Sequence, residues 1–201
     1  MARLARAPRR AVGLAIRTMY RRGRFVSAAP TRVVILRDAE PADAAAIARV
    51  HVRAWQAAYR GLMPEDFLDA QRPEDRESRY VLGSSDPAAP RTILAVSEDA
   101  VIGFATIGPT RDEDVPGAGE LYALYIDPLH WRGGVGRTLL LESRERLRRA
   151  GHEQALLWVL AGNETAARFY RTDGWREDGT TREEDPWGIA VQVGRFRRPL
   201  T

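Results

Sequence analysis

The sequence predicts a single α/β domain in which helices flank a mixed β-sheet of about six to seven strands. Three observations support this prediction. Short apolar runs alternate with segments of helical periodicity across residues 31–201. Two of the runs, 121–126 and 155–160, are apolar or aromatic throughout, which is typical of strands covered on both faces. A glycine-rich segment at 132–136 separates the first of these strands from a helix.

Residues 1–30 differ from the domain in their charge. They contain eight arginines and no acidic residue, whereas the whole chain has 31 basic and 27 acidic side chains. The domain of residues 31–201 is therefore mildly acidic, and we expect no nucleic-acid-binding surface on it. We expect residues 1–30 to be a disordered extension. There are two alternatives. Residues 1–30 could form an organellar transit segment, or they could bind anionic membranes or nucleic acid through their arginines.

The composition excludes several classes of protein. No apolar run approaches the ~20 residues that a membrane-spanning helix needs. The chain has no cysteine, which excludes disulfides, thiolate metal sites and a cysteine nucleophile. Its three histidines, His51, His130 and His152, are spread without metal-ligand spacing, so we expect no metal. We expect a cytoplasmic protein, because the lack of cysteine agrees with a reducing compartment.

The first part of the domain reads as a strand followed by three helices. The β-branched run 33–36 predicts the strand. Acidic residues precede an amphipathic helix at 44–59, whose apolar residues recur every three or four positions. Shorter helices are predicted at 64–70 and 73–81, the latter with Arg76 in water.

A hairpin and a long connection come next. Strands at 92–96 and 101–107 are joined by a short turn, which is typical of a β-hairpin. Residues 109–117 are charged, and we expect a flexible loop there. The strand 121–126 then leads through the glycines into a helix at 137–150.

The last part of the domain contains a buried strand, a helix and a closing strand. The run 155–160 has the length and apolarity of a buried parallel strand. Asn163 is a good N-cap for a helix that continues to Asp173, with Gly174 in the C-terminal position. Residues 188–194 predict the strand that closes the sheet.

The glycine-rich segment has the properties of a phosphate site. A helix that begins with several glycines exposes backbone N–H groups and the positive end of its dipole. Leu139 stands where a dinucleotide fingerprint needs its third glycine, and the chain has no lysine for a P-loop. A turn that merely joins strand to helix is the alternative.

Two segments resemble the signatures of the GNAT superfamily of acetyl-CoA-dependent N-acetyltransferases. Residues 131–136, WRGGVG, fill the frame Gln/Arg-x-x-Gly-x-Gly/Ala, although Trp131 replaces the usual first residue. Residues 160–175 are similar to the second signature, Asn-x-x-Ala-x-x-Phe-Tyr-x-x-x-Gly-Phe. The resemblance covers about residues 31–201. It implies a single-domain GNAT fold in which the two buried parallel strands splay apart at the cofactor site.

The same resemblance implies acetyl-CoA as co-substrate and assigns its contacts. Backbone N–H groups of the glycine loop would bind the pyrophosphate, with two arginines as ionic partners or as a solvated rim. The main chain of the strand before the loop would pair with the pantetheine arm. The implied cofactor-binding residues are Leu124, Tyr125, Ile126, Arg132, Gly133, Gly134, Val135, Gly136, Arg137, Thr138 and Asn163. Asn163 also fits a helix cap alone.

Two residues match catalytic positions of the family. Tyr170 corresponds to the tyrosine that protonates the leaving thiolate, and a phenol with a pKa near ~10 keeps the proton that this role needs. Glu120 lies sixteen residues before Gly136, where the histone-type branch has a glutamate that deprotonates the amine through water. A strand end that meets solvent is the alternative for Glu120.

Three aromatic residues, Trp55, Tyr59 and Tyr122, would line the acceptor pocket by the same resemblance. Trp55 and Tyr59 also fit the role of ordinary core aromatics.

The sequence therefore predicts an N-acetyltransferase that moves the acetyl group of acetyl-CoA to a primary amine by direct attack in a ternary complex. We expect a small-molecule acceptor. A protein or peptide acceptor, and a non-catalytic CoA-binding regulatory module, are the alternatives. A homodimer is compatible with the family.

Overall fold

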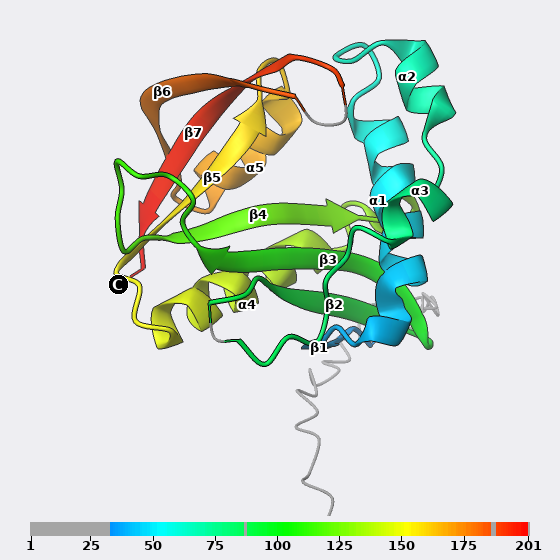
Figure 1. Ribbon diagram of the computed structural model, residues 1–201, viewed down its shortest axis with the longest axis horizontal. Coiled ribbons are helices and arrows are strands. Elements are labelled where there is room, and N and C mark those ends of the chain that lie inside the picture. The colour runs from blue at the N-terminus through cyan, green and yellow to red at the C-terminus, as the bar shows by residue number, and fades with distance from the viewer. Residues whose placement is uncertain (1–32, 87, 186–187, 201) are drawn as a thin grey trace, which may run out of the picture.

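The structure is a computed structural model that describes residues 33–86, 88–185 and 188–200. Its centre is one seven-stranded sheet with the order β1-β2-β3-β4-β5-β7-β6 (Figure 1). Strands β4 and β5 are parallel, and the other neighbouring strands pair antiparallel. The predicted α/β domain with a mixed sheet is thus confirmed. The extension predicted for residues 1–30 lies outside the described residues.

The strands are β1 (Ile35–Asp38), β2 (Arg91–Ser97), β3 (Ala100–Pro109), β4 (Gly119–Ile126), β5 (Gln154–Leu160), β6 (Arg176–Glu184) and β7 (Val191–Pro199). The helices are α1 (Ala44–Ala58), α2 (Glu65–Ala70), α3 (Glu74–Glu77), α4 (Val135–Arg149) and α5 (Glu164–Thr172), with 3-10 turns η1 (Pro41–Asp43) and η2 (Pro128–His130). Within the described ranges, no helix has the length and apolarity needed to cross a membrane.

Helices cover the sheet on both faces. Apolar residues of α4 and α5 pack with alternate residues of β3, β4 and β5 in the largest core cluster, which includes Leu139, Ala167 and Leu121. Helix α1 packs on the opposite face, where Ile47 and Val50 contact a second cluster (Figure 1). The alternation of side chains along each strand sends neighbouring residues to these two faces.

The parallel pair β4–β5 separates soon after it begins. Its register contains three residue pairs, from Gly119–Ala155 to Leu121–Leu157. Strand β4 continues to Ile126 while pairing with β3, and β5 continues to Leu160 while pairing with β7. The predicted splaying of these two strands is confirmed. A register shift in the β3–β4 pairing opposite Thr106 and Ile107 leaves Tyr122 as the extra residue of a bulge in β4.

One strand was missed and two predicted elements need correction. The polar strand β6 was not expected, because an edge strand of sequence REDGTTREE has no apolar alternation. The closing strand runs over Val191–Pro199 rather than 188–194. The third helix spans only Glu74–Glu77, and Arg76 is buried rather than in water. The guanidinium of Arg76 lies over the Trp55 ring at 4.9 Å from its centroid, which explains its burial.

The β3–β4 connection is fixed by ion pairs, in contrast to the flexible loop that its charge predicted. Arg195 of β7 is 4% exposed and donates to Asp112 at 3.1 Å and to Asp114 at 2.7 and 2.8 Å. It also donates to Asp178 of β6 at 2.7 Å. Arg182 of β6 adds a second bond to Asp112 at 2.6 Å. These contacts tie the connection to the two C-terminal strands.

Replacing Arg195 by methionine should destabilise the fold. The substitution preserves volume but removes one of the two cations bound to the buried carboxylate of Asp112 and the main ion pair of Asp178, which costs about 3 kcal/mol. Chemical denaturation should show this loss in the free energy of unfolding. Arg148→Met is the matched control, because Arg148 makes a bidentate pair with Glu145 at the surface and should change stability little. Equal effects of the two substitutions would contradict the role assigned to Arg195.

The stability of the fold should also depend on His51 in mild acid. His51 is buried in α1, stacked on Tyr125 at 4.6 Å, and burial lowers its pKa to about 3 from an ordinary value of 6.5. Between these values the unfolded chain binds a proton that the folded chain excludes. The free energy of unfolding should therefore fall by up to about 1.4 kcal/mol per pH unit as the pH drops below 6.5.

The variant His51→Phe keeps an aromatic ring against Tyr125 and removes this titration. Its free energy of unfolding should vary less between about pH 6.5 and 5, where carboxylates contribute little. Denaturation curves at several pH values measure the slope. A slope equal to that of the unmodified chain would show that His51 is not the group that responds.

Candidate active site

The glycine loop ends in a helix start with unpaired backbone donors. Gly134 is the N-cap of α4 and has a φ of 84°, a left-handed conformation that favours glycine. The first helical hydrogen bond runs from the Thr138 N–H to the Gly134 carbonyl at 3.0 Å. The N–H groups of Val135, Gly136 and Arg137 precede it and have no acceptor inside the helix. This arrangement suits an anionic ligand.

The helix start lies between the end of β4 and helix α5. A Cβ atom on Gly136 would sit 3.6 Å from both Ile126 and Phe169. The indole N–H of Trp131 donates to the Ile126 carbonyl at 2.8 Å. Trp131, the residue that departs from the family signature, therefore fastens the loop to β4. Arg132, Gly133, Gly134, Arg137 and Thr138 are exposed around the helix start.

The end of β4 presents backbone groups to the gap between the strands. Leu124, Tyr125 and Ile126 pair with β3 on one side, beyond the last β4–β5 residue pair. Polar groups on the other side of the strand need a partner from elsewhere. The side chains of Leu124 and Ile126 pack in the α4 cluster. The ring of Tyr125 points to the opposite face and stacks on His51.

Tyr170 reaches the same gap from α5. Its ring contacts Phe169, Trp175 and Phe196 with centroid distances of 5.2 to 6.4 Å. Burial raises the pKa of Tyr170, and the proximity of Tyr125 raises it further. The phenol is thus protonated at neutral pH.

Asn163 is the N-cap of α5. Its side chain accepts a hydrogen bond from the Ala166 N–H at 3.1 Å. This confirms the predicted cap. A contact with a cofactor stays a prediction.

Glu120 is completely buried on the face of β4 opposite α4, one residue before β4 and β5 part. The alternative that it marks a strand end in solvent is therefore wrong. Its carboxylate accepts hydrogen bonds from the Arg111 backbone N–H at 2.9 Å, from the Arg111 Nε at 3.2 Å and from a terminal nitrogen of the same guanidinium. Burial lowers the pKa of Arg111, but the bonds and charge of Glu120 outweigh it and the net shift is upward.

The three aromatic residues predicted for an acceptor pocket lie in different environments. Trp55 is 4% exposed and belongs to a core cluster. The Tyr59 hydroxyl lies 3.4 Å from the Tyr125 hydroxyl, close to the gap. Tyr122 donates from its hydroxyl to the Pro109 carbonyl, and its ring lies under the Arg111 guanidinium at 4.4 Å.

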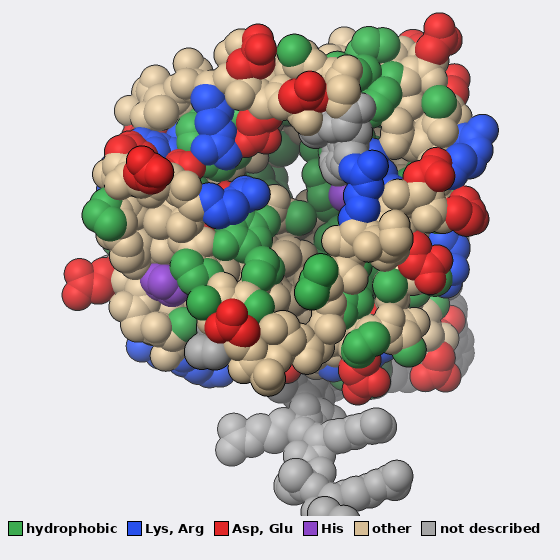
Figure 2. Space-filling model, in the orientation of Figure 1, with side chains coloured by type: hydrophobic (Ala, Val, Ile, Leu, Met, Phe, Trp, Pro, Cys, Tyr) green, Lys and Arg blue, Asp and Glu red, His purple; other side chains and the backbone are tan. Residues whose placement is uncertain are grey.

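The α1–α2 connection borders the gap on the α1 side. A Cβ atom on Gly162 would lie 3.1 Å from the Leu62 side chain, so this connection touches the β5–α5 turn. Leu160 and Val191 pack against the cluster that contains Met63. The surface is hollowed between the α1–α2 region and the β6–β7 arm (Figure 2). The gap between β4 and β5 is thus bounded on both sides.

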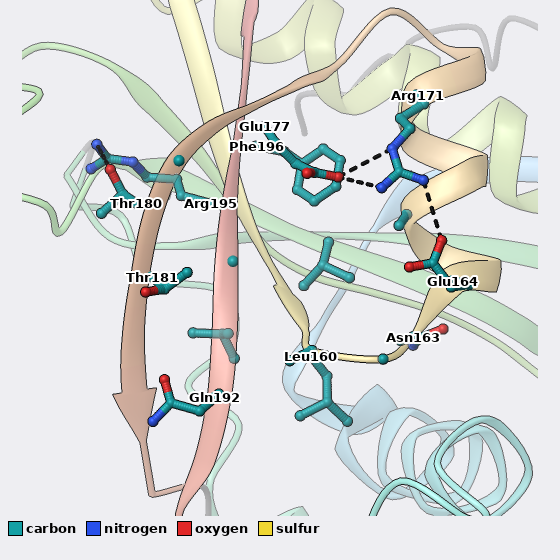
Figure 3. A pocket seen from close by; sticks show the side chains of 17 residues that line it. Leu160, Asn163, Glu164, Arg171, Glu177, Thr180, Thr181, Gln192, Arg195 and Phe196 are labelled. Atoms are coloured by element: carbon teal, nitrogen blue, oxygen red, sulfur yellow. Dashed lines mark hydrogen bonds and ion pairs between the residues drawn. The ribbon is translucent and has the colours of Figure 1, made fainter.

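A separate cavity of ≈ 230 Å³ lies between α5 and strands β5, β7 and β6 (Figure 3). It borders Asn163 and Leu160 but contains neither Tyr170 nor Glu120. Its Arg171 is bound to Glu164 and Glu177. The cavity therefore lies next to the gap between β4 and β5 and does not contain the proposed catalytic residues.

Arg111, Tyr80 and Glu184 were missed by sequence analysis, although each interacts with a residue of the site or with His51, which stacks on Tyr125. Tyr80 makes a hydrogen bond with His51, and the charge of Glu184 contributes to the upward pKa shifts of Arg111 and Tyr125. No local pattern marks these residues, because their partners come from other parts of the chain.

Comparison with known proteins identifies this arrangement. The sequence profile of the acetyltransferase (GNAT) family matches residues 46–175. The chain is 32% identical over 131 residues to the uncharacterized N-acetyltransferase YuaI of Bacillus subtilis, covering 65% of this chain and 74% of YuaI. It is 33% identical over 156 residues to the mycothiol acetyltransferase of Saccharopolyspora erythraea, covering 76% of this chain but only 44% of that protein.

The fold agrees with the sequence match. The crystal structure of the PaiA N-acetyltransferase of Thermoplasma acidophilum with coenzyme A superposes with a TM-score of 0.62 at 20% identity, covering 83% of this chain and 98% of that chain. The chain therefore belongs to the GNAT family of acetyl-CoA-dependent acetyltransferases.

Proposed function

We propose that the protein transfers the acetyl group of acetyl-CoA to the primary amine of a small molecule, with both substrates bound at the gap between β4 and β5. The observation that carries this proposal is the set of unpaired N–H groups at the start of α4, next to the freed edge of β4. Together they match a ligand with a diphosphate and an extended amide arm. Acetyl-CoA supplies the thioester acyl group.

The helix start is the proposed diphosphate site. The backbone N–H groups of Val135, Gly136 and Arg137 would bind the diphosphate, and the helix dipole adds a partial positive charge. Gly136 adds no side chain beside these donors, and Arg132 and Arg137 are exposed next to them. The residues present thus fit the ligand that the family uses.

Tyr170 is the proposed acid of the reaction. The neutral amine attacks the thioester carbon, the new C–N bond forms, and the C–S bond breaks. The departing sulfur takes the phenol proton of Tyr170, which its raised pKa keeps available, and the proton that the nitrogen loses as the amide forms restores the phenol. Glu120 is the proposed base. It accepts the proton that the acceptor ammonium must lose before the neutral amine can attack. Its burial on the α1 side of β4 supports a role away from the diphosphate.

A small-molecule acceptor is favoured by the shape of the site and by its relatives. The α1–α2 connection meets the β5–α5 turn, which restricts the entrance for an extended chain. Two matching proteins are a mycothiol acetyltransferase and, at 22% identity over 142 residues, a spermidine N(1)-acetyltransferase of Thermoplasma acidophilum. The chain spans less than half of the mycothiol enzyme's length, so that substrate is not carried over directly.

Release of free thiol from acetyl-CoA tests the proposal against a panel of small amines and peptides. Turnover with at least one small amine and little turnover with peptides is the expected result. Peptide turnover alone would reassign the acceptor class. CoA binding without thiol release for any acceptor would favour the non-catalytic CoA-binding module instead.

Gly136→Asp should weaken CoA binding while the protein stays folded. A carboxylate in the first turn of α4 interacts favourably with the helix dipole, but the Cβ atom of the new side chain would lie 3.6 Å from Ile126 and Phe169, so the melting temperature should change little. The same charge repels the diphosphate, and the Kd for CoA should increase about tenfold or more, or about 1.4 kcal/mol. Calorimetry measures both quantities.

Gly136→Asn is the control for this experiment, since it has nearly the same size without the charge. A smaller loss of CoA affinity than with aspartate is expected. Equal losses would indicate a steric effect, and unchanged affinity in both variants would remove the diphosphate from the start of α4.

Tyr170→Phe should lower kcat by about 100-fold, because the leaving sulfur loses its proton donor. The Kd for CoA should not change, since the ring packing is preserved. In the unmodified enzyme, the raised pKa of Tyr170 should prevent a loss of activity from this group up to about pH 10. Steady-state rates and calorimetry separate the two effects. Undiminished turnover of Tyr170→Phe would exclude the acid role.

A further inference from the structure

The only side chain that pairs with Glu120, among the residues that the structure describes, is Arg111. Glu120 has 1% of its side chain exposed, so its negative charge requires a cation beside it. Arg111 fills this requirement with its guanidinium and adds its backbone N–H on the second carboxylate oxygen. While the guanidinium is in this position, the acceptor cannot reach the carboxylate of Glu120.

The guanidinium of Arg111 has a direct path into water when another cation replaces it. Its side chain is 60% exposed, in contrast to the buried side chain of Glu120. The backbone of the loop is held separately, because Asp112 and Asp114 are bound to Arg195. The side chain can therefore move into water while the loop and its backbone bond to Glu120 remain in place.

The position of the guanidinium has the features of a cation site. It lies over the Tyr122 ring at 4.4 Å from the centroid and beside the carboxylate of Glu120. The charge of Glu184 also acts on it. A carboxylate group of a ligand would be repelled here by Glu120 and Glu184, whereas an ammonium group would gain the interactions that Arg111 makes now.

We propose that Arg111 is a built-in competitor that sets acceptor specificity: its guanidinium occupies the subsite of the acceptor's ammonium group and is displaced by it. This inference rests on the proposed function and names the chemical class of the acceptor, a cationic amine. A neutral or anionic molecule cannot replace Arg111 on the buried carboxylate, because it would leave that charge without a partner. The displaced guanidinium returns when the neutral amide product leaves.

Removal of the competitor should strengthen cation binding. In Arg111→Ala the subsite is free in every molecule, whereas in the unmodified protein a cation must first displace the guanidinium, so the affinity for a cation should rise at least about tenfold. Methylguanidinium chloride, titrated calorimetrically into CoA-saturated protein, should give measurable binding to Arg111→Ala. The unmodified protein should give much weaker binding, and so should Arg148→Ala, in which a similarly exposed bidentate arginine is removed from the surface of α4.

Steady-state kinetics with two acceptors of matched length add a test of charge selection. The KM for 1,4-diaminobutane should fall about tenfold in Arg111→Ala, while that for 4-aminobutyrate should fall less, because its carboxylate is repelled by Glu184 when its ammonium enters the subsite. A rise in the KM for 4-aminobutyrate would overturn the proposal and make Arg111 a carboxylate-binding residue. Equal methylguanidinium affinity in Arg111→Ala and the unmodified protein would also overturn it.

Arg111→Lys covers the case in which the alanine variant does not fold. Lysine retains a cation for Glu120 but lacks the planar fork of arginine, so methylguanidinium should displace it more easily than it displaces Arg111. Affinity no higher than in the unmodified protein would contradict the proposal. Calorimetry requires no acetyl transfer, so its outcome is independent of the proposed function, whose failure would appear as no thiol release with any acceptor.

Discussion

The early separation of β4 from β5 is the constraint on which the rest of the structure depends. Two parallel strands that share three residue pairs leave a row of backbone groups without a partner in the sheet. The surrounding elements are placed to use this gap. The start of α4 lies at one mouth, held to β4 by the Trp131 indole, while α5 brings Tyr170 to it and the α1–α2 connection bounds the opposite mouth.

The two mouths differ in their chemistry. The α4 side presents neutral backbone donors and a helix dipole, which act without desolvating a side-chain charge. The α1 side contains buried side-chain charges, of which Glu120 is the most enclosed. Such charges are tolerated because each is bound to a partner. An unpaired buried charge would destabilise the fold, so the partner must stay beside it. The site thus combines fixed backbone donors at the start of α4 with the carboxylate of Glu120, which in our proposal exchanges Arg111 for the acceptor's ammonium group.

Local sequence was sufficient for part of this arrangement. The glycine loop, the Asn163 cap and the two apolar parallel strands follow from residues within one element, and all three are present. Strand β6 was missed because its pairing with β7 holds it in the sheet, whereas its own sequence lacks apolar alternation. The pairing of Arg111 with Glu120 and the burial of Arg76 depend on tertiary contacts. Periodicity within one segment carries no information about them.

The place of β7 in the sheet has a consequence for how the chain assembles. This strand comes last in the sequence, yet it lies between β5 and β6 and supplies Arg195, whose partners in the β3–β4 connection are 81 and 83 positions earlier. Strand β6 has nothing to pair with until β7 is inserted. During synthesis on the ribosome, the N-terminal strands and α4 can collapse early, but the C-terminal arm must wait for residues up to Pro199. A nascent chain stopped before β7 would therefore have a formed glycine loop but no β6–β7 arm beside β5.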